Sequence, residues 1–153
     1  MSYTSADARQ GLLDEFAGAI EEIGRALACV GEAYDLLDEH AADRLEEEIF
    51  GPLQTAYGRA KRTHTGFAQR FGLPERAFAP SGPVGLASQG AALFLHGAIE
   101  AAEEADLLIG ELQDSMAPVE VGDAELRAGL AEVRELLTPV PHRTSQLLRV
   151  LGR

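Results

Sequence analysis

A long run of apolar residues at helical spacing constrains this chain more than any other feature of its sequence. Between residues 13 and 41, apolar side chains recur at alternating steps of three and four. This spacing places them on one face of a single helix, in an a/d heptad pattern held over four heptads. The stripe consists of Leu13, Phe16, Ile20, Ile23, Leu27, Val30, Tyr34, Leu37 and Ala41. Leu12 and Leu36 widen it, so a globular bundle fits the pattern as well as a coiled coil does.

A second stripe starts in a new register and predicts a second helix. It runs through Leu45, Ile49, Leu53, Ala56 or Tyr57, Ala60, His64, Phe67 and Phe71. Asp43 and Glu46 have the spacing of a capping box, which marks a helix start. We therefore place a tight turn near 38–42 and interpret Gly51-Pro52 as a kink inside the second helix. The competing interpretation is one continuous helix that ends at Gly51-Pro52.

Proline and glycine divide the chain into two halves. The segment 72–85 is rich in both residues and marks a connecting loop. A third stripe follows, from Val84 and Ala87 to Leu112, and its many Ala residues allow close helix packing. A fourth helix is expected from Asp123 to Leu137, before the interruption by Pro139 and Pro141. We expect one domain over 1–153, with hairpins over about 5–71 and 86–138 and a short helix over 144–151 that folds back onto the body.

Composition agrees with an all-helical chain. The sequence has 25 Ala and 21 Leu but only 12 Val and Ile together. Strands favour β-branched residues, whereas helices favour Ala and Leu. The sequence therefore predicts an all-α fold, and the four stripes predict an antiparallel up-down four-helix bundle.

An internal repeat relates the two halves. Shifting the chain by 79 residues aligns Gly18–Asp35 with Gly97–Asp114, with eight identities in 18 positions. The matches include Gly18 with Gly97 and Gly31 with Gly110. We interpret the halves as two αα-hairpins related by duplication. The four glycines then mark either close helix approach or space for a small ligand between the hairpins.

The charge alternates along the chain. The net charge is -12, divided as -10 over 1–50, +4 over 51–99, -9 over 100–135 and +3 over 136–153. In an up-down bundle both hairpin turns lie at one end. That end would be acidic. The opposite end would be basic and would collect Arg62, Arg70, Arg76, Arg143, Arg149 and Arg153. We expect the acidic pole to attract a basic protein partner.

Six carboxylates repeat with the same spacing in both halves. They are Glu21, Glu32, Asp35, Glu100, Glu111 and Asp114. Clustered carboxylates can hold Mg²⁺, so these residues are the candidate metal ligands. The pairs Glu100/Glu103 and Glu111/Asp114 are similar to the carboxylate sets of all-α nucleotide pyrophosphohydrolases. That family places its sets on different helices, whereas here both lie on one helix. The resemblance implies a Mg²⁺-dependent phosphohydrolase as an alternative function.

Other chemistry is poorly represented. The sequence has no phosphate-binding loop, dinucleotide fingerprint or Gly-x-Ser-x-Gly motif. Its single Cys29 lacks the basic surroundings of a reactive thiol, apart from Arg25. His64 and His96 fall in apolar surroundings and are interpreted as packed side chains. We assign no catalytic residue and no cofactor, with Mg²⁺ as the alternative.

The leading interpretation is a non-enzymatic interaction or scaffold protein that self-associates. The Ala-rich third helix and surplus Leu side chains favour a homodimer. The acidic net charge argues against nucleic acid as a partner, and no apolar run is long enough to span a membrane. We expect a cytoplasmic protein. A small-ligand binder between the hairpins is the second alternative.

Overall fold

The computed structural model describes residues 2–79 and 90–152, and every regular element in them is helical. The predicted all-α class is therefore confirmed. The elements are α1 (Ser2–Asp35), α2 (Glu39–Leu45), the π-helix η1 (Glu46–Phe50), α3 (Gly51–Arg70), α4 (Ala91–Asp114), α5 (Ala117–Glu120), α6 (Ala124–Leu137) and α7 (Val140–Leu151). The predicted helix start at 86, with Val84 and Ala87, lies outside the described residues. No helix among the described residues combines the length and apolar character needed to cross a bilayer.

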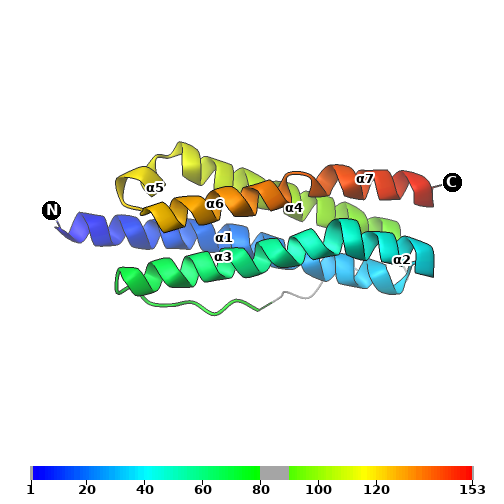
Figure 1. Ribbon diagram of the computed structural model, residues 1–153, viewed down its shortest axis with the longest axis horizontal. Coiled ribbons are helices and arrows are strands. Elements are labelled where there is room, and N and C mark those ends of the chain that lie inside the picture. The colour runs from blue at the N-terminus through cyan, green and yellow to red at the C-terminus, as the bar shows by residue number, and fades with distance from the viewer. Residues whose placement is uncertain (1, 80–89, 153) are drawn as a thin grey trace.

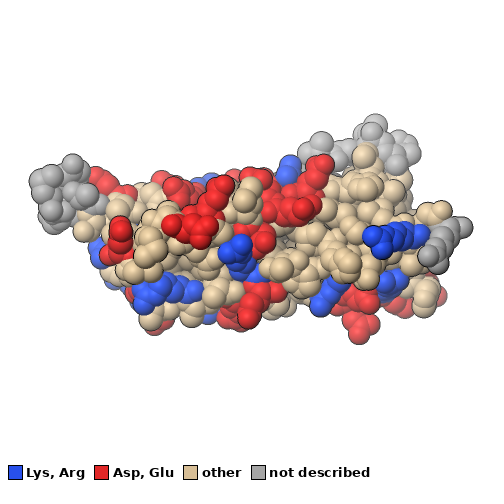
Figure 2. All heavy atoms as spheres, turned by 90° about the horizontal axis from the view of Figure 1, so that it is seen from above, with Lys and Arg blue, Asp and Glu red and all other residues tan. Residues whose placement is uncertain are grey.

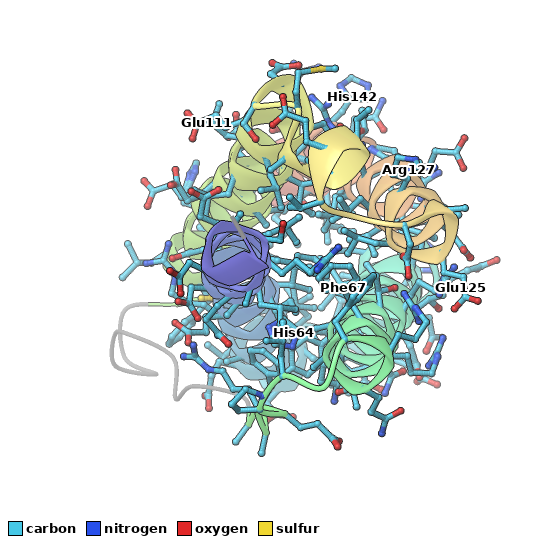
Figure 3. The ribbon with its side chains drawn as sticks, turned by 90° about the vertical axis from the view of Figure 1, so that its left-hand side faces the viewer. His64, Phe67, Glu111, Glu125, Arg127 and His142 are labelled. Atoms are coloured by element: carbon cyan, nitrogen blue, oxygen red, sulfur yellow. The ribbon has the colours of Figure 1, made fainter. Side chains whose placement is uncertain are left out.

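The long helices lie side by side around one shared core (Figures 1 and 3). Helices α1 and α4 are antiparallel, with Gly97 near the start of α4 beside Cys29 near the end of α1, and so are α3 and α6. Thr63 on α3 approaches Gly129 on α6, and Arg70 near the end of α3 meets Asp123 at the start of α6. The widest interfaces join α1 to α4 and α3 to α6. Fully buried Phe67 points into the interior in Figure 3.

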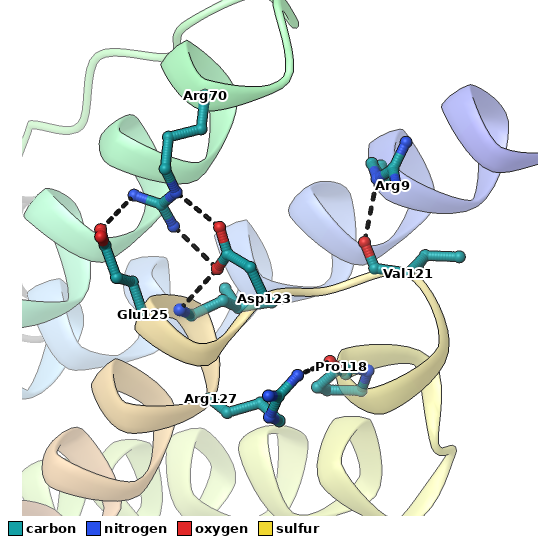
Figure 4. Close-up of polar contacts among 8 residues, drawn as sticks. Arg9, Arg70, Pro118, Val121, Asp123, Glu125 and Arg127 are labelled. Atoms are coloured by element: carbon teal, nitrogen blue, oxygen red, sulfur yellow. Dashed lines mark hydrogen bonds and ion pairs between the residues drawn. The ribbon is translucent and has the colours of Figure 1, made fainter.

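The order of helix directions differs from the up-down prediction. Arg9, near the start of α1, donates a hydrogen bond to the carbonyl oxygen of Val121 in the second turn, at 2.9 Å (Figure 4). The first turn, 36–38, is at the far end of α1. The two hairpin turns therefore lie at opposite ends of the molecule, and α3 runs parallel to α4. The up-down prediction failed because α3 ends at Arg70 and α4 begins only at Ala91, and a separation of this length does not force α4 to run antiparallel to α3.

This arrangement also overturns the predicted charge poles. Arg70, assigned to a basic end, makes a two-point ion pair with Asp123 and a further one with Glu125 at 2.8 Å (Figure 4). At the other end, Arg44 pairs with the carboxylate of Glu48 at 2.9 Å, and Arg143 donates a hydrogen bond to the backbone carbonyl oxygen of Glu48. Figure 2 shows acidic and basic side chains interspersed over the face that it presents. Opposite charges thus meet at both ends of the molecule. The two hairpin turns do not lie at the same end.

The first turn is shorter and earlier than predicted. Helix α1 ends at Asp35, and Asp38 caps α2 by accepting a hydrogen bond from the backbone N–H of Ala41 at 2.8 Å. Asp43 lies inside α2, so the capping box with Glu46 was wrong. Asp38 satisfies a backbone donor of the first helical turn, which is the usual role of an N-cap Asp.

The π-helix η1 ends at Phe50 and α3 begins at Gly51, so helical backbone continues without a break through Gly51-Pro52. The backbone is helical on both sides, and η1 immediately precedes the pair. The N–H of Gly51 donates to the carbonyl oxygen of Glu46, five residues back. A π-turn of this kind accommodates a residue that cannot follow the α-helical bonding pattern. The interpretation of a helix that ends here was wrong.

The C-terminal segment is longer than expected. Helix α7 begins at Val140 instead of 144 and is separated from α6 only by Thr138 and Pro139. It continues in the direction of α6 and packs on α4 and η1 (Figure 1). It does not fold back. Pro139 and Pro141 fall at the helix start, where their missing N–H groups cost nothing.

Candidate functional site

A groove follows the outer face between α1 and the η1–α3 arm. Its central hollow measures about 450 Å³ and is lined by Leu27, Ala28, Phe50, Gln54, Tyr57, Gly58 and Lys61. A second hollow of about 290 Å³ is lined by Gly31, Tyr34, Glu46 and Phe50. Because Phe50 lines both hollows, they form one groove with aromatic walls. We call this the α1/α3 groove.

The groove owes its shape to local sequence choices. Gly24 on α1 has no side chain, and a Cβ there would lie 3.4 Å from the ring of Tyr57. The ring can therefore lie against α1, where it is 6% exposed and its burial raises the pKa of its hydroxyl. Phe50 packs only partly against the core, so its remaining surface faces the groove.

The groove changes charge along its length. Glu46 lines one end, and Lys61 lines the other. The ammonium of Lys61 lies 4.2 Å from the ring centre of Tyr57, a favourable cation–π contact. Among the described residues, Lys61 forms no ion pair with a carboxylate. In a chain of net charge -12, such a lysine is a free positive charge beside an apolar surface.

A basic hollow continues from the Lys61 end. It measures about 560 Å³ and is lined by Lys61, Arg62, Thr65, Gly66, Gln69, Arg76, Ala77 and Phe78. The segment that follows α3 forms its second wall. Arg76 is held there by an ion pair with Glu21 on α1 and lies 5.5 Å from the ring centre of Phe78. Lys61 and Arg62 are the cations of this hollow that no carboxylate of the described residues pairs.

His64 connects the wall of this hollow to the core through contacts with Leu13 and Phe78. It is 2% exposed, and its Nε2 donates a hydrogen bond to the carbonyl oxygen of Leu13 at 3.0 Å. The donation fixes the neutral tautomer, with an unprotonated Nδ1 that has no hydrogen-bond partner among the described residues. The ring of Phe78 meets the imidazole edge-on, with centroids 5.1 Å apart. Burial lowers the pKa of His64, as the interpretation of a packed histidine implies.

The six predicted metal ligands are spread along two antiparallel helices. Asp35 and Asp114 end α1 and α4 and therefore lie at opposite ends of the molecule. Glu21 is paired with Arg76, and Glu111 points away from the interior in Figure 3. Glu100 is exposed and Glu32 half-buried. In the described part of the chain, no three His, Cys, Asp or Glu side chains lie close enough together to hold a metal ion.

The repeated glycines do not share one role. A Cβ at Gly18 or Gly31 would meet no described atom within 4 Å. At Gly97 it would lie 3.2 Å from the sulfur of Cys29, and at Gly110 it would lie 2.9 Å from Arg134. Among the described helical glycines, the tightest contact with another helix is instead at Gly129, where a Cβ would lie 2.3 Å from Thr63 Oγ1. The apolar stripes carry no signal for this contact.

The Ala-rich surface proposed for dimerisation is already covered. Ala98, Ala101, Ala102 and Ala105 are fully buried, and α4 packs most widely on α1. Cys29 is also buried, and burial raises the pKa of its thiol. This face therefore cannot serve a partner. Phe50 and Gln54 were missed as groove residues because they fall outside the apolar stripe. The doublet Ile49-Phe50 was the one signal of a second apolar direction.

Comparison with protein-family models, with curated proteins and with solved structures finds no match.

Proposed function

We propose that this protein is a non-enzymatic interaction protein that self-associates through the α1/α3 groove. The observation that carries this proposal is the aromatic wall of the groove, which Phe50 continues through two adjoining hollows. Tyr34 adds an exposed ring at one end, with 41% of its surface accessible. Aromatic residues, Tyr and Phe among them, are enriched at the buried centres of protein interfaces.

Charge favours a second copy of the chain as the occupant. A protein of net charge -12 repels its own copies unless they meet where positive charge is available. The groove offers both signs, with Glu46 at one end and Lys61 at the other. A self-complementary surface is what a twofold homodimer needs.

The internal duplication belongs to the same proposal. Helices α1 and α4 end at Asp35 and Asp114, which are 79 residues apart, as the repeat predicts. After α1 the next helix starts at Glu39, whereas α6 starts at Ala124, because the short helix α5 lies in the second turn. We propose a four-helix bundle over 1–153, made of two hairpins that diverged most in their turns.

Light scattering over micromolar to millimolar concentrations tests the self-association. We expect a dimer whose dissociation constant rises in Phe50→Gln and Tyr34→Gln, since both variants remove aromatic groove surface. Leu107→Gln is the matched control, because Leu107 is 54% exposed and lies on α4 outside the groove. A strict monomer over this range, or equal weakening by the control, would contradict the proposal.

The alternative of a Mg²⁺-dependent phosphohydrolase predicts a different result. Ligand binding to the folded state raises the melting temperature, so Mg²⁺ or Mn²⁺ would stabilise such an enzyme and Glu111→Gln would remove the effect. We expect no shift with either ion. A shift that depends on Glu111 would replace the scaffold proposal with the enzyme. The same assay with nucleotides or other small ligands tests the second alternative.

A further inference from the structure

We infer that two copies of this chain pair antiparallel along their α1/α3 grooves, so that Glu46 of each copy meets the partner's Lys61. This inference rests on the proposed self-association and adds its orientation. It starts from the opposite charges at the two ends of one continuous apolar groove. The structure places both residues on the same helical arm, 15 residues apart.

A twofold axis makes such a surface complementary to itself. In an isologous contact, residue i of one copy meets residue j of the other, and j meets i. A twofold axis perpendicular to the groove near Gln54, midway between Glu46 and Lys61, places the two grooves face to face and antiparallel. The aromatic centres then cover one another, and each charged end meets its opposite. One dimer contains two such ion pairs.

The parallel arrangement is disfavoured by the same charges. An axis along the groove would bring Glu46 against the partner's Glu46 and Lys61 against the partner's Lys61. Like charges placed together at an interface oppose association. The free ammonium of Lys61, held over the Tyr57 ring at the edge of the apolar surface, is suited to the antiparallel contact.

Charge reversal tests this orientation without ambiguity about intramolecular effects. Fifteen residues of helix span about 22 Å, more than twice the Debye length of about 8 Å at physiological salt. Glu46 and Lys61 of one chain therefore have no appreciable interaction. Any compensation between reversals at these two positions must come from contact between chains.

The experiment compares Glu46→Lys, Lys61→Glu and the double variant by sedimentation equilibrium. We expect each single variant to raise the dissociation constant about tenfold, because it turns two surface attractions into repulsions. The double variant should return to within about threefold of the parent. An equimolar mixture of the two single variants should form a heterodimer, since that pairing restores both contacts. Both variants stay strongly acidic, so bulk charge does not draw them together.

Glu47→Lys is the control. It makes the same charge change on the same π-helix at an exposed residue that does not line the groove, and it should leave the dissociation constant unchanged. A double variant as weak as the product of the single effects would overturn the antiparallel orientation. If Phe50→Gln dissociates the dimer but the reversals do not couple, only the orientation fails. A parent chain that is monomeric removes the proposed function as well.

Discussion

Arg143 supplies a donor where Pro52 lacks one. Its Nη1 donates a hydrogen bond to the carbonyl oxygen of Glu48 at 3.2 Å, and Glu48 is the residue whose carbonyl an α-helix would pair with the N–H of residue 52. Proline has no such N–H. A side chain from α7 thus contacts the backbone at the irregular turn that precedes α3, and it ties the C-terminal helix to η1.

This contact predicts a coupled pair of substitutions. Arg143→Gln should lower the free energy of unfolding by about 1 kcal/mol, the usual value of one hydrogen bond. In a Pro52→Ala background the loss should be smaller, because that substitution restores a backbone donor for the carbonyl oxygen of Glu48. Urea unfolding of the four variants measures the coupling. Arg149→Gln on the exposed side of α7 is the control, and an equal loss in both backgrounds would contradict the prediction.

His64 predicts a dependence of stability on pH. Burial lowers its pKa in the folded chain, against opposing contributions from the hydrogen bond with Leu13 and from Asp14, while Arg76 lowers the pKa further. The unfolded chain therefore takes up the proton first. The contribution of neutral His64 to the free energy of unfolding is fully present above the ordinary histidine pKa of 6.5, and it decreases as the pH falls below that value.

Unfolding by urea at several pH values measures this effect. His64→Gln should flatten the slope between pH 7 and pH 5, whatever its effect on the absolute stability, with exposed His40→Gln as control. A slope that persists in His64→Gln would assign the dependence to other groups. The Arg70–Asp123 ion pair lowers the pKa of the Asp123 carboxyl. Its contribution to the free energy of unfolding is therefore lost only as the pH falls below the ordinary aspartate pKa.

Two Gly→Ala substitutions should change the stability of the protein in opposite directions. Gly129→Ala places a Cβ 2.3 Å from Thr63 Oγ1, and relieving that overlap should cost about 1–3 kcal/mol. Gly18→Ala meets no described atom within 4 Å and should stabilise α1 by about 0.5–1 kcal/mol through helix propensity. Thermal unfolding distinguishes them, and a stabilised Gly129→Ala would contradict the close contact of α3 with α6.

Asp123 predicts a separation of two roles at the start of α6. It accepts a hydrogen bond from the N–H of Leu126 at 2.9 Å and pairs with Arg70. Asp123→Asn keeps the cap but loses the charge, whereas Asp123→Ala loses both. Since exposed ion pairs contribute little and N-caps about 1 kcal/mol, Asp123→Ala should be clearly less stable than Asp123→Asn in thermal unfolding. Equal losses would assign the stability to the ion pair.

The sequence predicted what depends on local periodicity and missed what depends on the return path of the chain. The stripe from Leu13 to Val30 specified α1, and the helical character of the described residues agrees with the high content of Ala and Leu. The direction of α4 relative to α3 is set across the long separation between Arg70 and Ala91, and the apolar periodicity of each helix does not encode how two helices are oriented. The prediction of charge poles failed for the same reason, because Arg70 and Asp123 come together only when α4 runs parallel to α3.

The candidate site was less accessible to sequence reasoning than the fold. A groove is made by side chains that fall just outside the apolar stripe, such as Phe50, and by a missing side chain, as at Gly24. From the amino-acid sequence alone, neither Phe50 nor Gly24 can be distinguished from an ordinary surface residue. His64 was recognisable because it occupies a core position of the second stripe. Its partner Leu13 was not, because a backbone carbonyl leaves no trace in the residue type.

The pairing of α1 with α4 and of α3 with α6 also determines how the chain must fold. The widest interfaces join the two hairpins to each other rather than the helices within each hairpin, so the contacts that stabilise the fold span long stretches of sequence. High contact order slows folding. Neither hairpin can keep its apolar surface covered alone, and the halves should therefore unfold together in one cooperative transition, with exchange of a hairpin between two chains as the characteristic misassembly.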